Sequence, residues 1–196
     1  MFTGIIEAVG RIKQIEQRDG GVRLTIESDT LDFSDVALGD SIAANGVCLT
    51  VISQAGKSYT IDVSQETLNC TVGLDAIGEV NLEKAMRLSD RLGGHLVSGH
   101  VDGVGEVVKF EPVGESYLLR IRSPRELSRF IAPKGSITVN GVSLTVNEVS
   151  GDEFTINLIP HTLDVTTLKH VKPGSRVNLE ADMLARYVDR LLHPDN

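Results

Sequence analysis

The chain has 196 residues, of which 41% are hydrophobic and 23% charged, and its formal net charge is −8. This composition is typical of a globular protein, and its acidic balance argues against a nucleic-acid partner, which selects a basic face. No apolar run reaches the roughly 18 residues that a membrane-spanning helix needs, and residues 1–5 lack the features of a secretory signal. Cys48 and Cys70 are too few for a disulfide framework, so we expect a reduced, cytoplasmic protein without a membrane partner.

Short stretches of Val, Ile, Leu and Thr, separated by Gly, Asn and Asp, run through both halves of the chain. Residues 24–26, 59–63 and 154–158 alternate apolar and polar side chains, as half-buried strands do. Asn45-Gly46 and Asn140-Gly141 lie between apolar stretches, and both residues of such a pair tolerate positive φ, so we expect type I′ hairpins. The pattern predicts an all-β fold with a small closed barrel or a sandwich in each half.

Three segments depart from the strand pattern, and two of them lie inside the chain. The segment from Lys84 to Leu96 is mixed and polar and contains the pair Gly93-Gly94, so we expect the linker between the halves there. Ser123, Pro124 and Glu126 predict the start of a short helix with Ser123 as its N-cap.

The third departure is the C-terminal segment. Its apolar residues recur at spacings of three and four, as on one face of a helix of about three turns; they are Met183, Leu184, Tyr187, Val188, Leu191 and Leu192. This helix packs either on its own barrel or against copies of itself in an oligomer, and the sequence does not separate the two.

The two halves repeat one sequence with an offset of 95 residues (140 − 45). Residues 45–51, N-G-V-C-L-T-V, return at 140–146 as N-G-V-S-L-T-V, and the V-N-L-E of 80–83 returns at 177–180 with an offset of 97 (177 − 80). A register held over this length predicts two copies of one domain and two similar pockets. We expect domains at 1–95 and 96–180, followed by a C-terminal helix and tail at 181–196.

Some equivalent positions differ in chemical kind. Cys48 corresponds to Ser143, Ile5 to His100, Glu66 to His161 and Gly39 to Lys134. Two pockets of one shape but different reactive groups could polarise two molecules of one compound in opposite senses. The alternative is neutral drift between duplicated domains.

Other sites are not indicated. His95 and His100 lie five residues apart with glycine between them, which is not the spacing of a helical metal pair, and further zinc ligands are not evident. Neither G-x-G-x-x-G nor G-x-x-x-x-G-K occurs, so neither a dinucleotide nor a P-loop triphosphate site is suggested.

Four motifs together resemble one known family. They are the start M-F-T-G-I-I-E, the paired N-G-V-[C/S]-L-T-V segments, G-G-H-L-V-S-G-H-V at 93–101 and I-P-H-T-L at 159–163. From Met1 to about His193 the chain resembles riboflavin synthase of the alpha-chain type, the lumazine-binding repeat family. The resemblance implies two tandem six-stranded Greek-key β-barrels and a C-terminal helix that assembles a homotrimer, with the active site between subunits.

The resemblance also implies an activity, that of a transferase in the final step of riboflavin biosynthesis. Two molecules of 6,7-dimethyl-8-ribityllumazine exchange a four-carbon unit, which gives riboflavin and 5-amino-6-(D-ribitylamino)uracil. No metal and no organic cofactor are implied, and an association with lumazine synthase is left open.

Site residues carried over from the family fall in two sets. In the first barrel the implied ligand contacts are Gly4, Ile5, Ile6, Cys48, Leu49, Thr50, Asp62, Val63, Ser64, Gln65, Glu66 and Thr67. In the second barrel they are Gly99, His100, Val101, Lys134, Ser143, Leu144, Thr145, Asn157, Leu158, Ile159, Pro160, His161 and Thr162.

Catalytic roles are expected for three of these residues. His100 is the candidate for proton transfer, because imidazole titrates near neutral pH, and Cys48 and Ser143 are candidates to polarise the ring in their own barrels. Asn140 stands where the family often has Asp, which puts a role for an ionised carboxylate at that position in doubt.

Two interpretations from other functional classes remain. A non-catalytic lumazine- or flavin-binding protein would keep the barrels but lose reactive groups of one or both pockets. Those groups are all present here, which favours the enzyme; they are Cys48, Glu66, His100, Lys134, Ser143 and His161. A flavin-reductase barrel would need a nicotinamide-binding domain, for which no residues are left.

Overall fold

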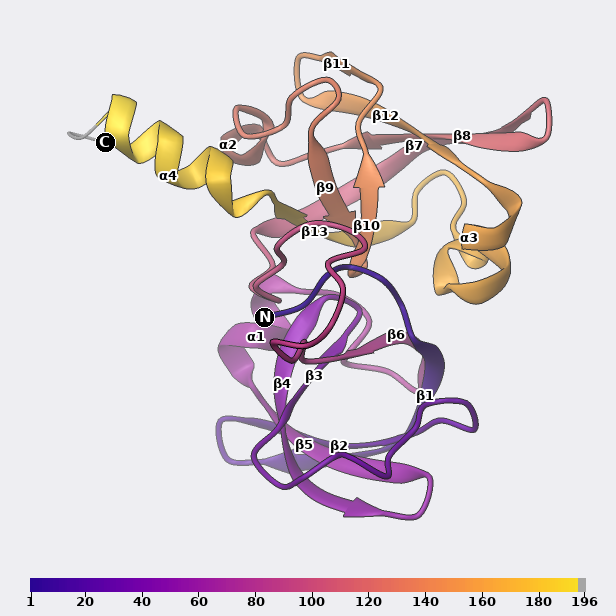
Figure 1. Cartoon of the computed structure of the whole chain (residues 1–196), viewed down its shortest axis with the longest axis vertical. Coiled ribbons are helices and arrows are strands. Elements are labelled where there is room, and N and C mark those ends of the chain that lie inside the picture. Colours follow the sequence, from indigo (N-terminus) through magenta and orange to yellow (C-terminus); the bar gives the residue numbers. More distant parts are fainter. Residues whose placement is uncertain (194–196) are drawn as a thin grey trace.

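Two β-barrels are stacked on one another, and a C-terminal helix extends from the second (Figure 1). The computed structural model describes residues 1–193. The first barrel contains β1 (Ala8–Arg18), β2 (Gly21–Glu27), β3 (Ser41–Ala44), β4 (Val47–Ala55), β5 (Ser58–Ser64), α1 (Gln65–Cys70) and β6 (Gly78–Lys84).

The second barrel follows the same order of elements, with a short helix, an additional strand and a 3₁₀ helix inserted. It contains β7 (Gly103–Val113), β8 (Ser116–Arg122), α2 (Arg125–Ser128), β9 (Ser136–Val139), β10 (Val142–Thr145), β11 (Glu148–Ser150), β12 (Glu153–Leu158), α3 (Pro160–Val165), the 3₁₀ helix η1 (Thr167–His170) and β13 (Arg176–Ala181). It is followed by α4 (Met183–Leu192). The structure confirms the all-β fold, and both halves form barrels, not sandwiches.

The first barrel is closed, with strand order β1-β2-β5-β4-β3-β6 and β6 paired back to β1. Strands alternate inward apolar and outward residues, so each barrel has its own core. The fully buried Leu24, Ile26 and Ile61 correspond, at the offset of 95, to Leu119, Ile121 and Ile156 of the second core. The repeat therefore preserves the inward-facing positions.

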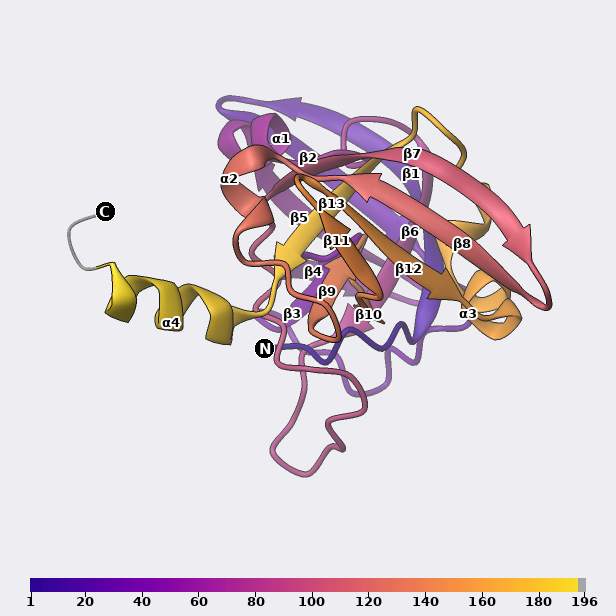
Figure 2. The ribbon, with the colours of Figure 1, turned by 90° about the horizontal axis from the view of Figure 1, so that it is seen from above.

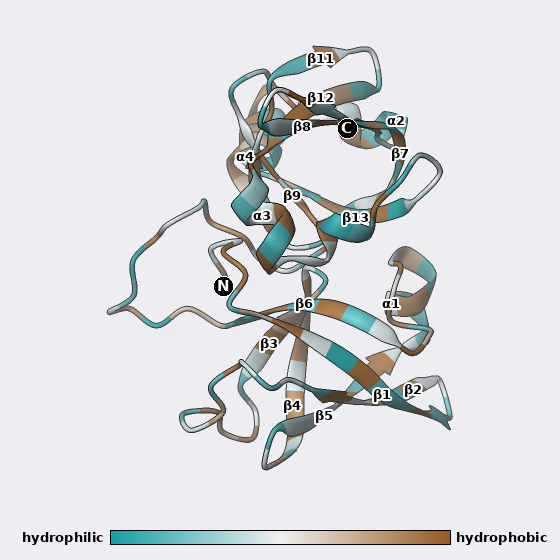
Figure 3. Ribbon diagram, turned by 90° about the vertical axis from the view of Figure 1, so that its right-hand side faces the viewer, coloured by the Kyte–Doolittle hydropathy of each residue, from teal (hydrophilic) through white to brown (hydrophobic). Residues whose placement is uncertain are grey.

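The second barrel has seven strands where the repeat predicts six. Its sheet runs β10-β9-β13-β7-β8-β12-β11, and its two outer strands follow one another in the chain. Seen nearly along its axis, this barrel forms a ring (Figure 3). The break between β10 and β11 spans Val146 and Asn147, which is the position of the β4 bulge between Val51 and Ser53 shifted by 95. The strand that is continuous but bulged in the first repeat, β4, is therefore divided into β10 and β11 in the second.

The tips of the two Asn-Gly hairpins touch at the junction of the barrels. Asn45 and Gly46 have φ of 47° and 81°, and Asn140 and Gly141 have φ of 49° and 82°, which confirms the type I′ turns. A Cβ added to Gly46 would lie 2.7 Å from the Gly141 backbone nitrogen, and one added to Gly141 would lie 2.8 Å from that of Gly46. Only glycine permits this approach.

Asparagine amides cross this junction in both directions. Asn81 Nδ2 donates to the Asn140 carbonyl oxygen at 2.9 Å, and Asn178 Nδ2 donates to the Asn45 carbonyl oxygen at 3.0 Å. Asn140 Oδ1 accepts from Asn178 N at 2.8 Å, as Asn45 Oδ1 accepts from Asn81 N at 2.9 Å. The side chain of Asn140 thus has a structural task that requires an oxygen acceptor and no charge.

The predicted start of the short helix is wrong. α2 begins at Arg125 with Pro124 as its N-cap, and no side chain caps it. Ser123 instead donates its hydroxyl to the Asp152 carbonyl oxygen at 3.1 Å, so its oxygen is committed to the neighbouring turn. Glu126 consequently completes no capping box.

The C-terminal helix α4 stands away from both barrels (Figures 1 and 2). Asp182 caps it by accepting from Leu184 N, and Arg186–Asp102 and Arg129–Asp189 ion pairs join it to the second barrel. None of its residues is buried, and its apolar side chains are 54–81% exposed; they are Leu184, Tyr187, Val188, Leu191 and Leu192. The helix does not pack on its own barrel. Among the described residues no helix has the length and apolarity to cross a membrane.

We predict that Gly46→Ala destabilises the protein more than Gly20→Ala does. Both glycines have nearly the same φ, 81° and 80°, but a Cβ at Gly20 meets nothing within 4 Å. The backbone conformation should cost about 1–2 kcal/mol in each variant, and overpacking against Gly141 should add about 1–3 kcal/mol in Gly46→Ala. Urea unfolding measures both free energies, and equal losses would contradict the close approach of the hairpins.

Candidate functional site

Two short arms of the chain exchange between the barrels. Residues 2–6 form the first arm and residues 97–101 the second, and they meet in an antiparallel bridge in which Phe2 and Val97 exchange backbone hydrogen bonds of 2.8 and 3.0 Å. Beyond the bridge, Ile6 packs against the core of the second barrel and Val101 against the core of the first. Each arm therefore completes the barrel to which it does not belong.

The exchange brings each arm beside the reactive position of the other barrel. Ser143 N donates to the Gly4 carbonyl oxygen at 2.7 Å, and Cys48 N donates to the Gly99 carbonyl oxygen at 2.8 Å. A Cβ at Gly4 would lie 2.6 Å from Ser143 Cβ, and one at Gly99 would lie 2.6 Å from Cys48 Cβ. Both glycines have positive φ, 75° and 79°, so two independent constraints demand glycine.

This contact corrects the assignment of the arms to barrels. Gly4, Ile5 and Ile6 were expected in the pocket of the first barrel, but the first arm lies against Ser143 of the second. Gly99, His100 and Val101 were expected in the second, but the second arm lies against Cys48 of the first. The repeat identifies equivalent residues, and it contains no information on which copy each arm contacts.

A buried carboxylate holds each arm. Glu83 Oε1 accepts from Thr3 N at 2.6 Å and from Thr3 Oγ1 at 2.7 Å, and its Oε2 accepts from Gly4 N at 3.0 Å. Glu180 accepts from the backbone and side chain of Ser98, both at 2.7 Å, and from Gly99 N at 3.0 Å. Burial raises the pKa of both carboxyl groups, and these hydrogen bonds oppose the shift. The sequence indicates these two carboxylates by an acidic residue at the same place in each of the two V-N-L-E segments, which are otherwise largely apolar.

The first candidate half-site surrounds Cys48. Cys48 and Thr50 point outward from β4, whereas Leu49 and Val63 point into the core and can offer only backbone groups. Cys48 is a free thiol packed against a small apolar cluster of Phe2, Ala43 and Val97.

The end of β5 and helix α1 border this half-site, because β5 runs antiparallel to β4 and its end lies toward the start of β4. Ser64 caps α1 by accepting from Thr67 N at 3.1 Å. Asp62 is held by Arg23 through two 2.8 Å contacts, which keep the pKa of its carboxyl low, and Glu66 accepts from the Cys70 thiol at 3.4 Å. Gln65 also lies on α1 and is exposed.

The second candidate half-site surrounds Ser143 in the same way. Ser143 and Thr145 point outward from β10, while Leu144 packs against the core. Leu158 is fully buried at the end of β12 and can offer only its backbone. The exposed residues Asn157, Ile159, Pro160 and His161 and the half-buried Thr162 follow along β12 and α3.

His100 and Lys134 are both exposed. The second arm places His100 on the Cys48 side, where its backbone donates to Ser98 Oγ at 3.2 Å. Burial raises the pKa of Asp102, and the backbone hydrogen bond from Ala181 and the neighbouring Arg186 and His100 oppose this shift. Lys134 occupies a turn with φ of 66°, and its backbone N donates to the Val146 carbonyl oxygen at 2.8 Å.

Sequence reasoning missed His95. Its Nδ1 lies 2.7 Å from Ser143 Oγ, although 48 residues separate the two in the chain. His95 has no equivalent in the repeat, so the comparison of the two halves could not reveal it. The flanking Gly93-Gly94 pair was the available signal, because a Cβ at Gly94 would lie 2.8 Å from Ser143 Cβ.

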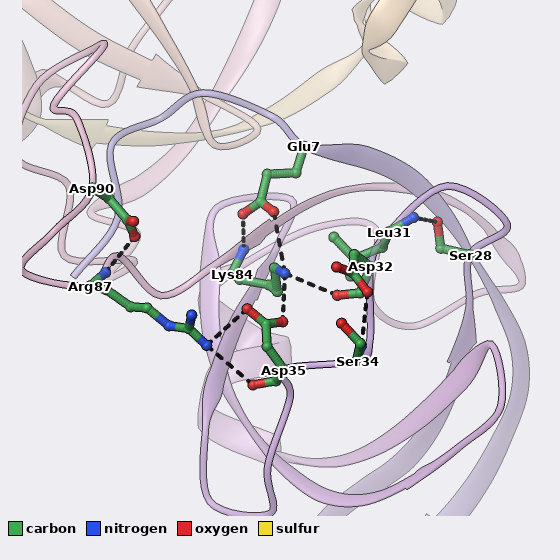
Figure 4. Close-up of polar contacts among 9 residues, drawn as sticks. All are labelled: Glu7, Ser28, Leu31, Asp32, Ser34, Asp35, Lys84, Arg87 and Asp90. Atoms are coloured by element: carbon green, nitrogen blue, oxygen red, sulfur yellow. Dashed lines mark hydrogen bonds and ion pairs between the residues drawn. The ribbon is translucent and has the colours of Figure 1, made fainter.

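A cavity of about 590 Å³ lies between the first arm, the loop before β3 and the start of the linker. Of the expected site residues, only Ile5 lines this cavity. Its wall is a set of ion pairs in which Asp35 holds Lys84 and Arg87, each at 2.8 Å, and Glu7 accepts from Lys84 N at 2.7 Å (Figure 4). The Lys84 hydrogen bond lowers the pKa of Asp35. These contacts anchor the linker that delivers His95 and the second arm.

Among the described residues no group of three or more His, Cys, Asp or Glu side chains could hold a metal ion. The chemistry available at the half-sites is that of a thiol, hydroxyls, imidazoles and backbone amides.

The model of the lumazine binding domain matches residues 3–85 and again residues 98–182. The chain belongs to the lumazine-binding domain family. Each match contains one arm and one barrel. The residues between the two matches include His95, so this imidazole is supplied by the linker and not by the repeated domain.

Relatives of this lumazine-binding protein cover nearly its whole length. Riboflavin synthase of Photobacterium phosphoreum is 49% identical over 197 residues, which cover 100% of this chain and 90% of the relative. Riboflavin synthase of Bacillus subtilis (strain 168) is 43% identical, with 100% and 92% covered. The crystal structure of LumP complexed with 6,7-dimethyl-8-(1'-D-ribityl) lumazine is 30% identical, with a TM-score of 0.81 over 92% of this chain and 99% of LumP. LumP complexed with riboflavin gives a TM-score of 0.82 at 31% identity, with the same coverage.

We predict that Glu83→Gln and Glu180→Gln each destabilise the protein by about 1–3 kcal/mol. In either variant the amide NH₂ of glutamine replaces one carboxylate oxygen and leaves a buried N–H of the arm without an acceptor. Urea unfolding at neutral pH measures the loss. The exposed Glu148→Gln serves as the control and should change stability by less than about 0.5 kcal/mol. A loss no larger than the control's would show that the carboxylates do not hold the arms.

Proposed function

We propose that the protein catalyses the riboflavin synthase reaction, in which two molecules of 6,7-dimethyl-8-ribityllumazine yield riboflavin and 5-amino-6-(D-ribitylamino)uracil. One observation carries the proposal. A chain 43–49% identical to riboflavin synthases holds two equivalent half-sites, each made from an arm of one repeat and the outward strand of the other. Two identical heterocycles need two binding sites of the same shape.

The reaction calls mainly for positioning. Loss of a proton from the methyl group at C7 of one lumazine gives a carbanion that is delocalised into the ring, and this attacks the second lumazine. Holding two reactants in register supplies on the order of 7–11 kcal/mol in well-aligned systems, whereas an acid–base side chain typically contributes about 10²–10⁴-fold in rate. The described residues supply the hydroxyls and backbone amides that such positioning needs.

Individual roles follow from exposure and chemistry. His100 moves the methyl proton, since its imidazole is exposed beside the first half-site. Cys48 and Ser143 polarise one ring each, and Thr50 and Thr145, both exposed on the same outward faces, hydrogen-bond the pyrimidinedione edges. Lys134 and Glu66 contact the ring or the ribityl chain.

The alternative is a binding protein that holds lumazine without turning it over. It shares the fold, because LumP complexed with lumazine superposes with a TM-score of 0.81. Enzymatic function is favoured here because the riboflavin synthases of Photobacterium phosphoreum and Bacillus subtilis share 43–49% of their sequence with this chain, against 30–31% for LumP.

The active unit we propose is a homotrimer in the cytoplasm, with the first half-site of one subunit facing the second half-site of its neighbour. The uncovered apolar face of α4 supports assembly, since a monomer rarely leaves such a face in water. The two free cysteines support a reducing compartment.

We predict that purified protein converts the lumazine without any added cofactor, consuming two molecules for each riboflavin formed. Absorption spectroscopy follows flavin formation, and chromatography counts both products. A spectral shift that does not grow with time would indicate the binding protein.

We predict that His100→Ala lowers kcat by about 100-fold, the low end for an acid–base group. Cys48→Ala should lower it less, because positioning survives. Cys70→Ala, the same class of change at a thiol outside the expected set, serves as the control. Wild-type turnover in both His100→Ala and Cys48→Ala at saturating lumazine would refute the role assignment.

We predict that Leu184→Asp combined with Leu191→Asp dissociates the assembly and lowers turnover, while each barrel stays folded. Leu88→Asp is the matched control, since Leu88 is an exposed leucine outside the helix. Light scattering measures the molar mass and circular dichroism the fold. A monomeric wild type, or an intact trimer in the double variant, would contradict the role of α4.

A further inference from the structure

The second arm is followed by a carboxylate that a residue of α4 contacts. Asp102, two residues after His100, donates its backbone N–H to the Leu179 carbonyl oxygen at 2.8 Å. Its Oδ2 accepts from Ala181 N at 2.8 Å and from Arg186 Nη2 at 3.0 Å. The side chain of Asp102 is only 16% exposed. This end of the arm is therefore held between the end of β13 and the start of α4.

Arg186 also acts on the other end of the second arm. Its Nε atom is buried, so the guanidinium lies against the second barrel and not in open solvent. Burial raises the pKa of Glu180, and the hydrogen bonds from Ser98 and Gly99 and the positive charge of Arg186 oppose the shift. One cation on α4 therefore stabilises both carboxylates that hold this arm.

The first repeat has the same carboxylate, but its cation lies elsewhere. Glu7 corresponds to Asp102 at the offset of 95 (102 − 7). It accepts from Lys84 N at 2.7 Å, and Lys84 Nζ lies 3.9 Å from Glu7 Oε2 (Figure 4). Lys84 corresponds to Ala181 at the offset of 97 (181 − 84). The first arm thus takes its cation from a strand of its own repeat, whereas the second has alanine at that position and takes its cation from α4.

The hold of this cation on the arm depends on how firmly α4 is fixed. None of the residues of α4 is buried. An ion pair at a partly exposed surface contributes little, because the side chains lose freedom in making it. A subunit that covers the apolar face of α4 fixes the backbone of Arg186, so less freedom remains to be lost when the guanidinium meets Asp102. Assembly therefore strengthens the contact.

We propose that Arg186 is a positioning residue for the first half-site, and that it makes the placement of the second arm depend on assembly through α4. The arm in turn places Gly99 against Cys48 and carries His100 on the same side. The first arm does not share this dependence, because its cation is Lys84. The inference rests on the proposed function for its effect on turnover, whereas the placement of the arm is measured without turnover.

The test separates the hold on the arm from the hold on the helix. Arg186→Met and Asp102→Asn remove the two sides of the contact, singly and combined, and Arg186→Lys keeps the charge. Arg129→Met is the matched control, because Arg129 also joins α4 to the second barrel, through a 2.9 Å contact with Asp189. Within the part of the chain that the structure describes, Arg129 makes no ion pair with the second arm.

The readout of the arm is the rate at which iodoacetamide alkylates Cys48. Gly99 covers this residue, since a Cβ at Gly99 would lie 2.6 Å from Cys48 Cβ. Every variant is made in a Cys70→Ala parent, in which Cys48 is the one remaining thiol of the sequence. Lumazine turnover gives kcat, light scattering gives the molar mass, and thermal unfolding shows that each variant is folded at the assay temperature.

We expect Arg186→Met and Asp102→Asn each to raise the alkylation rate and to lower kcat by about tenfold, the effect of one hydrogen bond to a charged group. The combined variant should change no more than Arg186→Met alone, because both side chains act through one contact. Arg186→Lys should stay within about threefold of the parent, since the contact is a single one and not bidentate. Arg129→Met should match the parent.

The dependence on assembly is tested in the variant that combines Leu184→Asp with Leu191→Asp. Its dissociation should raise the alkylation rate, and adding Arg186→Met should raise the rate no further, because the contact is already weak without assembly. A further rise of about tenfold on adding Arg186→Met would show that the contact holds the arm without assembly, and would overturn that part of the proposal.

An alkylation rate in Asp102→Asn equal to that of the parent would overturn the proposal. This variant leaves α4 unaltered, so its result stands even where Arg186→Met lowers the molar mass. Multiplied changes of about 100-fold in the combined variant, or a change in Arg129→Met as large as in Arg186→Met, would also overturn it. A parent that forms no riboflavin from lumazine would refute the proposed function alone, and the alkylation rates would still decide the placement of the arm.

Discussion

The exchange of two arms between the barrels is the constraint on which the rest of the structure depends. The bridge between Phe2 and Val97 fixes where the arms cross, and a buried carboxylate, Glu83 or Glu180, then holds each arm by three hydrogen bonds. Ser143 and Cys48 each receive the carbonyl oxygen of an arm glycine as a result. Neither half-site exists in an isolated barrel, because each one takes its arm from the other repeat.

The junction of the barrels reinforces this arrangement. The touching glycine tips and the crossed asparagine amides join the two barrels directly, in addition to the arms. Asn140 belongs to this junction, where its oxygen accepts from the Asn178 backbone. The side chain of Asn140 therefore serves the junction, where an uncharged oxygen acceptor is sufficient.

Much of this fold can be predicted from the sequence, because the patterns that determine it are either local or repeated in the two halves. Alternation predicts the strands, Asn-Gly pairs predict the hairpins, and the offset of 95 predicts that Leu24 and Leu119 occupy equivalent core positions. The division of one strand into β10 and β11 was not predicted, because its cause is a bulge whose geometry differs between two similar sequences. Ser123 failed as a helix cap because a tertiary contact with Asp152 competes for its hydroxyl.

The candidate site shows even more clearly which features the sequence predicts and which it does not. Its residue types were predicted from the repeat and the family resemblance. Cys48, Thr50, Ser143 and Thr145 do lie on outward faces, and Cys48 and Ser143 are hydrogen-bonded to an arm. Their grouping was wrong, because a repeat states which residues are equivalent and never which ones touch. His95 was missed for a related reason: it lies in the linker, outside both copies, and meets Ser143 only through the tertiary fold.

Duplication followed by divergence gives one chain two half-sites that have the same backbone arrangement but different side chains around them. In one half-site a thiol lies against apolar side chains, and in the other a hydroxyl is held by an imidazole. Under the proposed function, two copies of one compound bound in these places would experience different electrostatic fields, which is the requirement for one of them to react as donor and the other as acceptor.

The most direct test of this account is a crystal structure of the assembled protein with an unreactive lumazine analogue. The account predicts two bound analogues for each active site, one beside Cys48 and Gly99 of one subunit and one beside Ser143 and Gly4 of another, with their rings stacked. A single bound ring, or two rings too far apart to react, would contradict it.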